Sequence, residues 1–313
     1  MDCTDRHDRY LLRLISRHAL LYSEMIPVGT LIYGDRDRCL ACDPFEQPLA
    51  LQIGGSDPVQ MAQCARFGED YGYKEINMNV GCPSKRVQSG RFGACLMVQP
   101  ELVAECIGAM RQAVRVPVTV KCRIGVDDHD SFEALCGFVE KVSNAGCGIF
   151  IIHARKAWLN GVSPRQNRRL PPLRHETVYA LKRQFPHLMI IINGGVTNLD
   201  SAEQHLKSVD GVMIGRGAYD NPYLLADVDR RFYNDQGPVA SRASILEHYI
   251  DYCERQLAAG CRLPRLARHV LGLFHGQPRA KAWRRSLTEY MHHPNAGVGV
   301  IREAAREVLS VAS

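Results

Sequence analysis

The sequence predicts an α/β fold: a TIM (β/α)8 barrel followed by a small all-helical domain. Between residues 20 and 215, short apolar runs alternate with longer helical patterns. This alternation implies parallel strands joined by right-handed crossovers. Several runs are almost wholly apolar, as strands buried on both faces are. Beyond residue 238 only helical patterns follow.

Seven strands are expected in the barrel. They cover residues 20–25, 49–53, 75–80, 116–122, 149–152, 189–192 and 211–214. A closed barrel of this type has eight strands, and only a helical pattern over residues 6–17 stands before the first run. A barrel without its first strand exposes two sheet edges, which is an unfavourable resting state. We therefore expect the encoded protein to start upstream of this chain.

Helical patterns lie between and after these strands. In the barrel they cover residues 57–70, 100–113, 131–145, 176–184 and 198–207, and in the second domain residues 244–259, 266–274, 280–292 and 300–311. Pro58 and Pro100 stand near two helix starts, where the missing N–H costs nothing. A polar linker at residues 234–238 separates the two parts. We expect a barrel over residues 1–236 and a helical domain over residues 237–313.

Composition narrows the class of protein. With 46% hydrophobic and 23% charged residues, the chain has ordinary globular composition rather than that of a disordered, collagen-like or coiled-coil protein. No apolar run approaches the roughly 18 residues that span a bilayer, and the charged N-terminus lacks the apolar core of a secretory signal. We expect a soluble, cytoplasmic protein with no membrane partner.

Twelve cysteines are spread from Cys3 to Cys261. Without an export signal they are expected to be free thiols, mostly small apolar fillers. Cys39 and Cys42 form the single CxxC pair. A structural zinc site usually needs a second pair or two histidines at ligand spacing, and neither stands nearby, so no metal is expected.

Positive charge is concentrated near the C-terminus. Residues 262–306 contain nine Lys and Arg against two Glu, a balance of +7, whereas the whole chain carries +6. Such a segment is typical of a surface that binds a polyanion. A solvated helix face would have the same composition, and charge alone does not decide between the two.

Polar residues end strands that are otherwise apolar. The active site of such a barrel lies at the carboxyl ends of its strands. The candidates there are Gln52, Asn77, Asn79, Cys82, Lys121, Arg123, His153, Arg155, Asn193, Gly194, Gly195, Gly215 and Arg216.

The last two strands end in a pattern suited to phosphate. Asn193-Gly194-Gly195 closes one strand and Gly215-Arg216-Gly217 closes the next. The loops after the seventh and eighth strands are where these barrels hold phosphate. Glycines let backbone N–H groups approach an anion, and Arg216 supplies a guanidinium. A phosphorylated ligand is expected here, without an indication of which one.

Cys82 is the cysteine best placed for chemistry. It stands in a turn bracketed by Gly81 and Pro83, straight after a strand. A free thiol is mostly protonated near pH 7, so Cys82 could serve as a nucleophile or as a general acid. Lys121 and His153 face the same end of the barrel. Together with the phosphate pattern they suggest a flavin nucleotide, as one option among several phosphorylated ligands.

The chain resembles the tRNA-dihydrouridine synthases over nearly its whole length. The most specific match is residues 77–84, followed by Gly93-Ala94-Cys95-Leu96-Met97; residues 120–125, 153–155, 193–195 and 215–216 follow in the family's order and spacing. Residues 161–168, with Pro171-Pro172-Leu173, resemble the bacterial A subfamily, which modifies D-loop uridines 20 and 20a.

The resemblance implies a role for each candidate. Reduction of the uridine C5–C6 bond would use flavin mononucleotide (FMN), with NADPH as electron donor, and Cys82 would protonate C5. FMN would be held by Met1, Gln52, Lys121, His153, Asn193, Gly194, Gly195, Gly215 and Arg216. The substrate, tRNA, would contact Asn79, Lys156, Asn167, Arg168, Lys281, Arg284 and Arg285. A monomer is expected.

The sequence departs from the family in three places. The family's first strand ends in an element that contacts the flavin, and this chain begins inside it, with Met1 at its tail. Where the family usually has Gly-Ala-Arg before a Trp-Arg-Arg triplet, this chain has Arg279-Ala280-Lys281. Pro27 stands in an expected central strand, where proline is unfavourable.

Other readings remain open. A flavin barrel oxidoreductase acting on a small metabolite would leave the basic segment without a role. A non-catalytic tRNA-binding protein would follow if the absent first strand abolished flavin binding. A Schiff-base aldolase would use Lys121 as its nucleophile.

Overall fold

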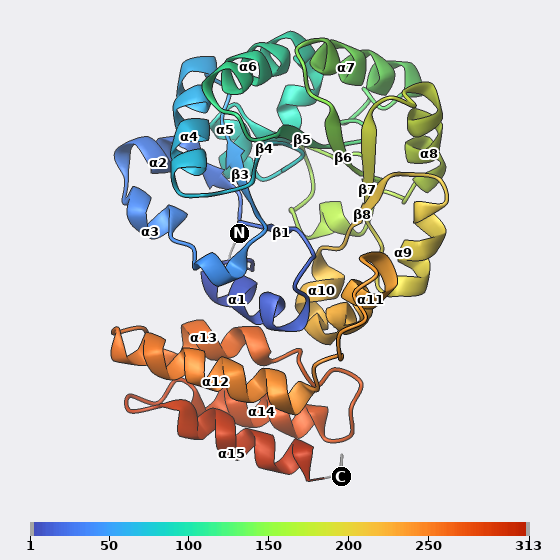
Figure 1. Cartoon of the computed structure of the whole chain (residues 1–313). Coiled ribbons are helices and arrows are strands. Elements are labelled where there is room, and N and C mark those ends of the chain that lie inside the picture. The colour runs from blue at the N-terminus through green and yellow to red at the C-terminus, as the bar shows by residue number, and fades with distance from the viewer. Residues whose placement is uncertain (1–2, 311–313) are drawn as a thin grey trace. The chain divides into compact units, whose positions relative to one another are not determined.

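The computed structural model describes residues 3–310, which belong to two compact units (Figure 1). The barrel unit comprises Tyr22–Cys42 and Pro48–Gly215, and the helical unit comprises Met1–Leu21, Asp43–Gln47 and Arg216–Ser313. The N-terminal segment thus belongs to the same compact unit as the C-terminal helices.

The barrel unit is built on a curled sheet. Its strands are β1 (Leu21–Tyr22), β2 (Ile26–Pro27), β3 (Leu49–Gly54), β4 (Glu75–Val80), β5 (Val118–Arg123), β6 (Ile149–His153), β7 (Met189–Asn193) and β8 (Gly211–Met213). They follow the order β1-β3-β4-β5-β6-β7-β8, with β2 also on β3, and the pairs from β2–β3 to β7–β8 are parallel. The predicted α/β barrel class is confirmed. Within residues 3–310, β8 pairs with β7 and with no other strand.

Helices surround these strands (Figure 1). They are α2 (Val28–Tyr33), α3 (Arg36–Leu40), α4 (Pro58–Asp70), α5 (Lys85–Ser89), α6 (Pro100–Ala113), α7 (Phe132–Asn144), α8 (His175–Gln184) and α9 (Leu199–Leu206), with 3-10 turns η2 (Gly93–Val98) and η3 (Gln166–Arg168). The five helices expected in the barrel are confirmed within two residues at each end. The short α2, α3 and α5 lack a full apolar stripe and were not expected.

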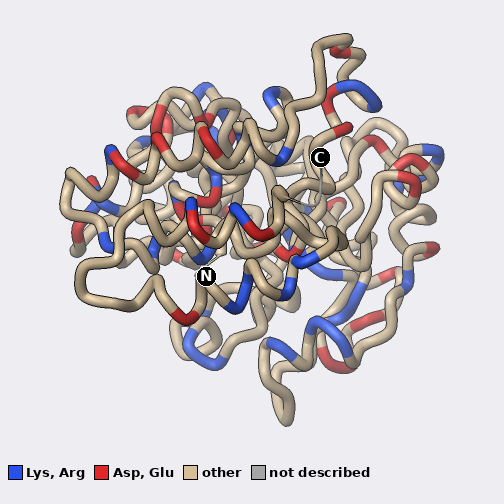
Figure 2. Tube along the Cα trace, turned by 90° about the horizontal axis from the view of Figure 1, so that it is seen from below, with Lys and Arg blue, Asp and Glu red and all other residues tan. Residues whose placement is uncertain are grey.

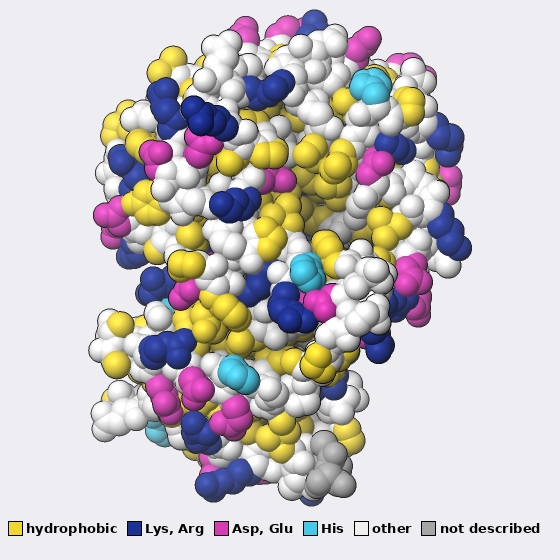
Figure 3. Space-filling model, in the orientation of Figure 1, with side chains coloured by type: hydrophobic (Ala, Val, Ile, Leu, Met, Phe, Trp, Pro, Cys, Tyr) yellow, Lys and Arg dark blue, Asp and Glu magenta, His cyan; other side chains and the backbone are white. Residues whose placement is uncertain are grey.

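Helix α4 shows which face of the sheet points outward. A Cβ on Gly68 would lie 2.6 Å from Leu51 Cδ2 and 2.5 Å from Ile76 Cδ1, so these two side chains pack on α4. Because side chains alternate along a strand, Gln52 and Asn77 point to the opposite, interior face. Figure 3 shows a hollow in the middle of the barrel unit with hydrophobic side chains around it.

The interior face has a polar half and an apolar half. On β4 and β5 it carries Glu75, Asn77, Asn79, Thr119, Lys121 and Arg123. On β6 and β7 the interior positions below the strand ends are Ile149, Ile151, Met189 and Ile191. Lys121 Nζ donates to Asn193 Oδ1 at 3.2 Å, so side chains of β5 and β7 meet across β6 on the interior face.

The strand expected over residues 20–25 is wrong as a single element. The structure has two short strands, β1 and β2, separated by residues 23–25. The Ser23 hydroxyl accepts the N–H of Gln52 at 2.9 Å, so a side chain takes the place of a backbone acceptor and interrupts the ladder. Pro27 ends β2 and directly precedes α2, a position in which a missing N–H is harmless.

The helical unit contains α1 (Arg6–Ile15), α10 (Arg216–Asp220), α11 (Val228–Phe232), α12 (Arg242–Ala258), α13 (Leu263–Val270), α14 (Ala280–Tyr290) and α15 (Val298–Leu309), with 3-10 turns η1 (Pro44–Glu46) and η4 (Pro222–Asp227). The helix expected over residues 266–274 begins three residues earlier, with Pro264 in its first turn. The last expected helix includes residue 311, which lies outside the described residues.

A buried histidine joins α13 to the N-terminal segment within the helical unit. His269 Nε2 lies 3.0 Å from Asp5 Oδ1, and its Nδ1 lies 3.5 Å from Asp8 Oδ1. Burial alone would lower the pKa of His269, but hydrogen bonds and charges from Asp5 and Asp8 raise it. The imidazole of His269 thus links the N-terminal segment to α13 through Asp5.

Candidate functional site

The expected site residues of the barrel unit stand at the carboxyl ends of its strands. Gln52, Asn79 and Lys121 lie within β3, β4 and β5, His153 and Asn193 are the last residues of β6 and β7, and Gly215 follows β8. Arg216 begins α10 in the helical unit. Met1 lies outside the described residues.

Hydrogen bonds from the Asn79 side chain and from the backbone hold the turn that carries Cys82. Asn79 Oδ1 accepts the N–H groups of Gly81 at 3.1 Å and Cys82 at 3.0 Å. The Cys82 carbonyl accepts the N–H of Ala94 at 2.9 Å. Gly93 has φ +76°, and a Cβ there would lie 2.6 Å from the Cys82 oxygen. The turn at residues 81–83, which we call the Cys82 turn, therefore packs directly on the Gly93 segment.

Arg123 connects this turn to the segment between β6 and α8. Its Nε donates to the Gly81 carbonyl at 2.8 Å, and its Nη1 donates to the carbonyls of Lys156 at 3.0 Å and Asn167 at 3.4 Å. The residue is 4% exposed. Burial lowers its pKa to about 10, while the neighbouring Cys82 acts to raise it. The buried guanidinium of Arg123 thus donates hydrogen bonds to three carbonyl oxygens, those of Gly81, Lys156 and Asn167.

Replacing Arg123 with methionine is expected to loosen both the Cys82 turn and the segment between β6 and α8. Each buried carbonyl left without a donor costs about 1–3 kcal/mol, partly offset by the cation no longer buried, so the free energy of unfolding should fall by about 2–3 kcal/mol. Urea unfolding measures the loss. Arg123→Lys is the matched control, because an ammonium keeps the charge without the planar set of donors. Full recovery in Arg123→Lys would contradict the geometric role.

Lys121 is a buried cation with an amide as its partner. Its Nζ donates to Asn193 Oδ1, and Asn193 Nδ2 in turn donates to the Met213 carbonyl at 2.8 Å. Burial and, to a lesser extent, Arg123 lower the pKa of Lys121 to about 8. No carboxylate of residues 3–310 forms an ion pair with it. A cation in this position fits an electronegative or anionic ligand.

The glycines after β7 leave room beside His153. Gly194 has φ +116°, and a Cβ there would lie 2.7 Å from His153 Cδ2. His175 Nε2 lies 2.9 Å from the Gly194 carbonyl and fixes the backbone at that point. Gly215 has no atom within 4 Å of an added Cβ. The strand ends thus present open backbone of the kind that phosphate and planar cofactors approach.

The residues expected near the substrate in the barrel unit are partly engaged by the protein. Lys156 Nζ contacts the Asp127 carbonyl at 2.9 Å and Asp130 at 3.2 Å. Asn167 is buried, and its amide exchanges two hydrogen bonds with the backbone of Trp158 at 2.7 and 2.8 Å. Its amide therefore orders the loop, so that a direct substrate contact would have to break these bonds. Arg168, beside it, is exposed.

Helix α14 presents basic residues on one side of the helical unit. Trp283 and Leu287 are buried, with Trp283 Nε1 donating to the Val270 carbonyl at 3.1 Å. Lys281 and Arg285, one turn apart, are exposed, and Arg284 lies partly exposed beside them. Arg284 and Arg285 line a shallow groove of about 450 Å³ with Thr288 and Glu289. None of the three cations forms an ion pair with residues 3–310.

Two other cations of the basic segment are paired with carboxylates. Arg302 pairs with Glu247 at 2.8 Å and Glu254 at 3.5 Å, and Arg306 pairs with Glu303 at 2.5 Å. Along the chain as a whole, basic and acidic positions are interspersed (Figure 2). Among the described residues, the unpaired cations of the segment therefore include Lys281, Arg284 and Arg285 of α14.

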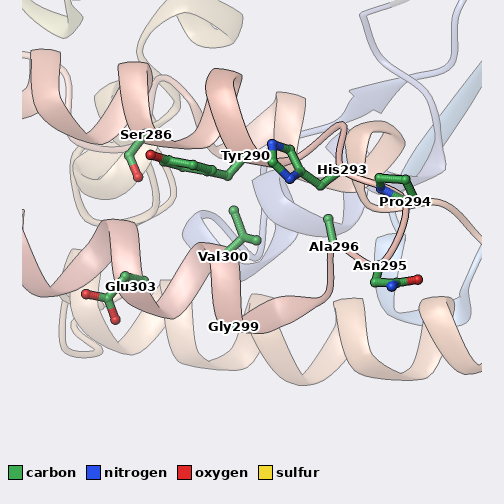
Figure 4. Close-up of a pocket in the computed structure, with 9 residues that line it drawn as sticks. All are labelled: Ser286, Tyr290, His293, Pro294, Asn295, Ala296, Gly299, Val300 and Glu303. Carbon is green, nitrogen blue, oxygen red and sulfur yellow. The ribbon is translucent and has the colours of Figure 1, made fainter.

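A larger cavity of about 550 Å³ lies between α14 and α15 (Figure 4). Tyr290 and Ser286 line it from α14, and Val300 and Glu303 line it from α15. This cavity has the carboxylate of Glu303 and no Lys or Arg in its lining, so it is less suited to phosphate than the groove at Arg284 and Arg285.

The two residues that sequence reasoning missed are Glu75 and Thr119. Both are buried polar residues on the interior face. The signal was present, because Glu75, Asn77 and Asn79 are polar at every second position of an otherwise apolar strand. That spacing places all three side chains on one face of β4.

Two further findings concern possible metal ligands and membrane-spanning helices. Within residues 3–310, one group of side chains brings possible metal-ligand atoms within 4.8 Å of one another: His18, Asp229 and Asp235. Neither Cys39 nor Cys42 belongs to this group. In the same part of the chain, no helix is both long and apolar enough to cross a membrane.

Comparison with known proteins adds to this geometry. A family model described as dihydrouridine synthase matches residues 1–309. The tRNA-dihydrouridine(20/20a) synthase of Synechocystis is 57% identical over 304 residues, covering 97% of this chain and 91% of its own. Proteins of the same name from Shewanella oneidensis and Escherichia coli K12 are each 53% identical, covering 98% of this chain and 92% and 89% of their own.

Solved structures of other proteins share the fold, and one example is a reductase. A 2-naphthoyl-CoA reductase in complex with 2-naphthoyl-CoA matches with a TM-score of 0.54 at 11% identity, covering 73% of this chain and 47% of that protein. At this identity the likeness concerns the fold alone.

Proposed function

The chain belongs to the dihydrouridine synthase family, and we propose that it reduces uridines 20 and 20a of the tRNA D-loop with bound FMN, NADPH as electron donor and Cys82 as proton donor. The reduction of tRNA uridine to dihydrouridine follows from the family and from relatives that share more than half of the sequence. Cofactor, electron donor, uridine position and residue roles are the proposal.

Lys121, with its amide partner Asn193, is the observation that supports flavin binding most directly. A buried ammonium without a carboxylate needs electron-rich ligand atoms nearby, and a flavin ring offers them. Gln52 and His153 would contact the ring from the neighbouring strand ends. Gly194, Gly195, Gly215 and Arg216 would hold the phosphate through backbone N–H groups and a guanidinium.

Cys82 would complete the reaction as a general acid. The bound flavin would supply the hydride that adds to C6 of uridine. Cys82 would give its proton to C5 and become a thiolate. Lys121 and Arg123 both lie close enough for Cys82 to act on their pKa values, so two cations would face that thiolate. Positive charge beside the group that gives up the proton would stabilise the transition state of the transfer.

The substrate base has to leave its stack in the tRNA to reach the strand ends. Asn79, Lys156, Asn167 and Arg168 would stand around the base and its backbone, Lys156 and Asn167 chiefly by ordering the loop. Lys281, Arg284 and Arg285 would contact tRNA phosphates. We propose a functional boundary near residue 236, between the flavin-binding and tRNA-binding parts, in a cytoplasmic monomer.

The proposal is tested with the purified chain. Its visible spectrum should show a flavin, and the cofactor released on denaturation should be FMN. With NADPH and tRNA made without modification, nucleoside analysis should detect dihydrouridine, and primer extension should place it at positions 20 and 20a. Dihydrouridine elsewhere would overturn the position, and NADH supporting equal rates would overturn the choice of NADPH.

Replacing Arg284 and Arg285 together with alanine is expected to weaken tRNA binding uniformly. Each lost phosphate contact should reduce the slope of log K against log salt by about 1, so the double variant should lose about 2. Binding measured at several salt concentrations gives the slope.

Arg302→Ala is the matched control, because this arginine is already paired with Glu247 and Glu254. It removes one positive charge from the same segment and should leave the slope unchanged. Equal losses in Arg302→Ala and in the double variant would show that overall charge, rather than the α14 groove, binds tRNA.

A further inference from the structure

A chain of polar side chains runs through the interior of the barrel unit and ends at the Cys82 turn. Its members, in spatial order, are Tyr22, Glu75, Thr119, Asn77, Gln52 and Asn79. Glu75, Asn77 and Thr119 are each less than 9% exposed. Only the last members reach the strand ends at which the reaction is proposed.

The chain begins at a buried carboxyl group. Tyr22 Oη donates to Glu75 Oε1 at 2.5 Å, and Thr119 Oγ1 donates to the same oxygen at 2.6 Å. Burial raises the pKa of Glu75. Because Oε1 accepts from both hydroxyls, the Thr119 hydroxyl hydrogen is directed at Glu75.

Each later hydrogen bond follows from the one before it. A hydroxyl has one hydrogen, so Thr119 Oγ1 can only accept from Asn77, whose Nδ2 lies 2.8 Å away. Asn77 Oδ1 then faces Gln52 Nε2, also at 2.8 Å. Gln52 Oε1 in turn accepts Asn79 Nδ2 at 2.8 Å. Asn79 Oδ1 is left to accept the N–H groups of Gly81 and Cys82.

The groups at the two ends of this row of side chains require the same donor-to-acceptor direction of its hydrogen bonds. Reversing the three amides would set the Asn79 amino group against two backbone N–H groups and would leave Thr119 without its donor. Inside a protein, consecutive hydrogen bonds polarise one another and hold their members more firmly than isolated pairs. Glu75 at one end and the Cys82 turn at the other are therefore coupled through five aligned hydrogen bonds.

We propose that Glu75, Thr119 and Asn77 are positioning residues for proton transfer, because their aligned hydrogen bonds orient Gln52 and Asn79 and thereby fix the Cys82 turn. The inference rests on the proposed role of Cys82 as proton donor. None of the three touches the reacting atoms. If these hydrogen bonds only satisfied buried polar groups, breaking them would lower the stability of the protein without loosening the Cys82 turn.

A matched pair of substitutions at Thr119 separates these possibilities. Thr119→Val keeps the shape but removes the hydroxyl, so Glu75 loses a donor and Asn77 loses its acceptor. Thr119→Ser keeps the hydroxyl and serves as the conservative control. Thermal unfolding of both variants verifies that they fold.

The first measurement is amide hydrogen exchange at Gly81 and Cys82 in the whole chain, which needs neither tRNA nor electron donor. Exchange should be about tenfold faster in Thr119→Val, because Asn79 Oδ1 no longer holds these N–H groups in place, and unchanged in Thr119→Ser. The second is uridine reduction by the flavin-loaded enzyme. In Thr119→Val, kcat should fall about 10-fold to 100-fold with KM for tRNA and flavin reduction by NADPH unchanged, and Thr119→Ser should restore kcat.

The outcomes are distinct. Unchanged exchange at Gly81 and Cys82 in Thr119→Val would overturn the inference, whatever the activity. Faster exchange with unchanged kcat would overturn the role in proton transfer. If the wild-type chain formed no dihydrouridine at all, the proposed function would fail, while the exchange data would still show whether Thr119 fixes the turn.

Discussion

Replacing Cys82 with alanine is expected to lower the rate of dihydrouridine formation by about 10²–10⁴-fold, the usual contribution of a positioned proton donor. The structure gives the reason: the turn that carries the thiol is held by Asn79 and Gly93, and two cations stand near it. Flavin reduction by NADPH and tRNA binding should be unaffected. Single-turnover reduction of tRNA, followed by nucleoside analysis, measures the loss.

Cys95→Ala is the matched control, because this thiol belongs to the neighbouring segment and bonds the Phe92 carbonyl instead. It should keep most of the activity. Cys82→Ser should fall between wild type and Cys82→Ala, since a hydroxyl has a proton to give but is a weaker acid. Activity of Cys82→Ala near that of the wild type would show that another group or water protonates C5.

Replacing Lys121 with methionine should have opposite effects on flavin binding and on stability. Losing a charge-assisted hydrogen bond to the ligand is expected to weaken FMN binding by about 10-fold to 100-fold. The flavin-free protein should become more stable at pH 7, since a buried ammonium no longer has to be accommodated. Titration of the apoprotein with FMN and urea unfolding measure the two effects separately.

The pH dependence identifies the cause. The pKa of Lys121 is lowered from 10.5 to about 8 in the folded chain, so between these values the unfolded chain binds more protons and wild-type stability rises with pH. Below about pH 8 the full cost is present, close to 3 kcal/mol for a completely enclosed group. The Lys121 side chain is largely buried but not completely enclosed, and the variant also loses the bond to Asn193. We therefore expect a gain of about 1–2 kcal/mol at pH 7, shrinking towards pH 10.

Lys141→Met provides the comparison, because Lys141 pairs with Glu101 at the surface. Surface pairs contribute about 0–1 kcal/mol, so its stability should change little and without a trend in pH. A Lys121→Met protein that is less stable than the wild type at pH 7 would show that burial of the ammonium is already compensated in the empty barrel.

Most of the fold was predictable from the periodicity of hydrophobic residues, and most of the candidate site from polar residues at strand ends. Apolar runs located the strands from β3 to β8, because a strand buried on both faces leaves no other pattern. The run at residues 20–25 failed, because its apolar character could not reveal that Ser23 replaces a backbone acceptor. The short helices α2, α3 and α5 escaped for a related reason: they have too few turns to show a helical period.

The candidate site was predictable as a set of residue types at strand ends, but its connections were not. The sequence offers Arg123 as one of many polar candidates, and only the fold shows that its guanidinium bonds three carbonyls, those of Gly81, Lys156 and Asn167. Asn167 was expected near the substrate, yet its amide binds the backbone of Trp158, a contact between residues that no sequence pattern relates.

Register is a further consequence of the polar residues on β4. A slip of one position against β3 and β5 would turn Ile76 and Met78 into the interior and press Asn77 and Asn79 against the apolar side of α4. Every amide in the row would lose its partner at once, so a misaligned strand would be penalised several times over. The side chains that face the site therefore also make an incorrect register of the central strands energetically unfavourable during folding.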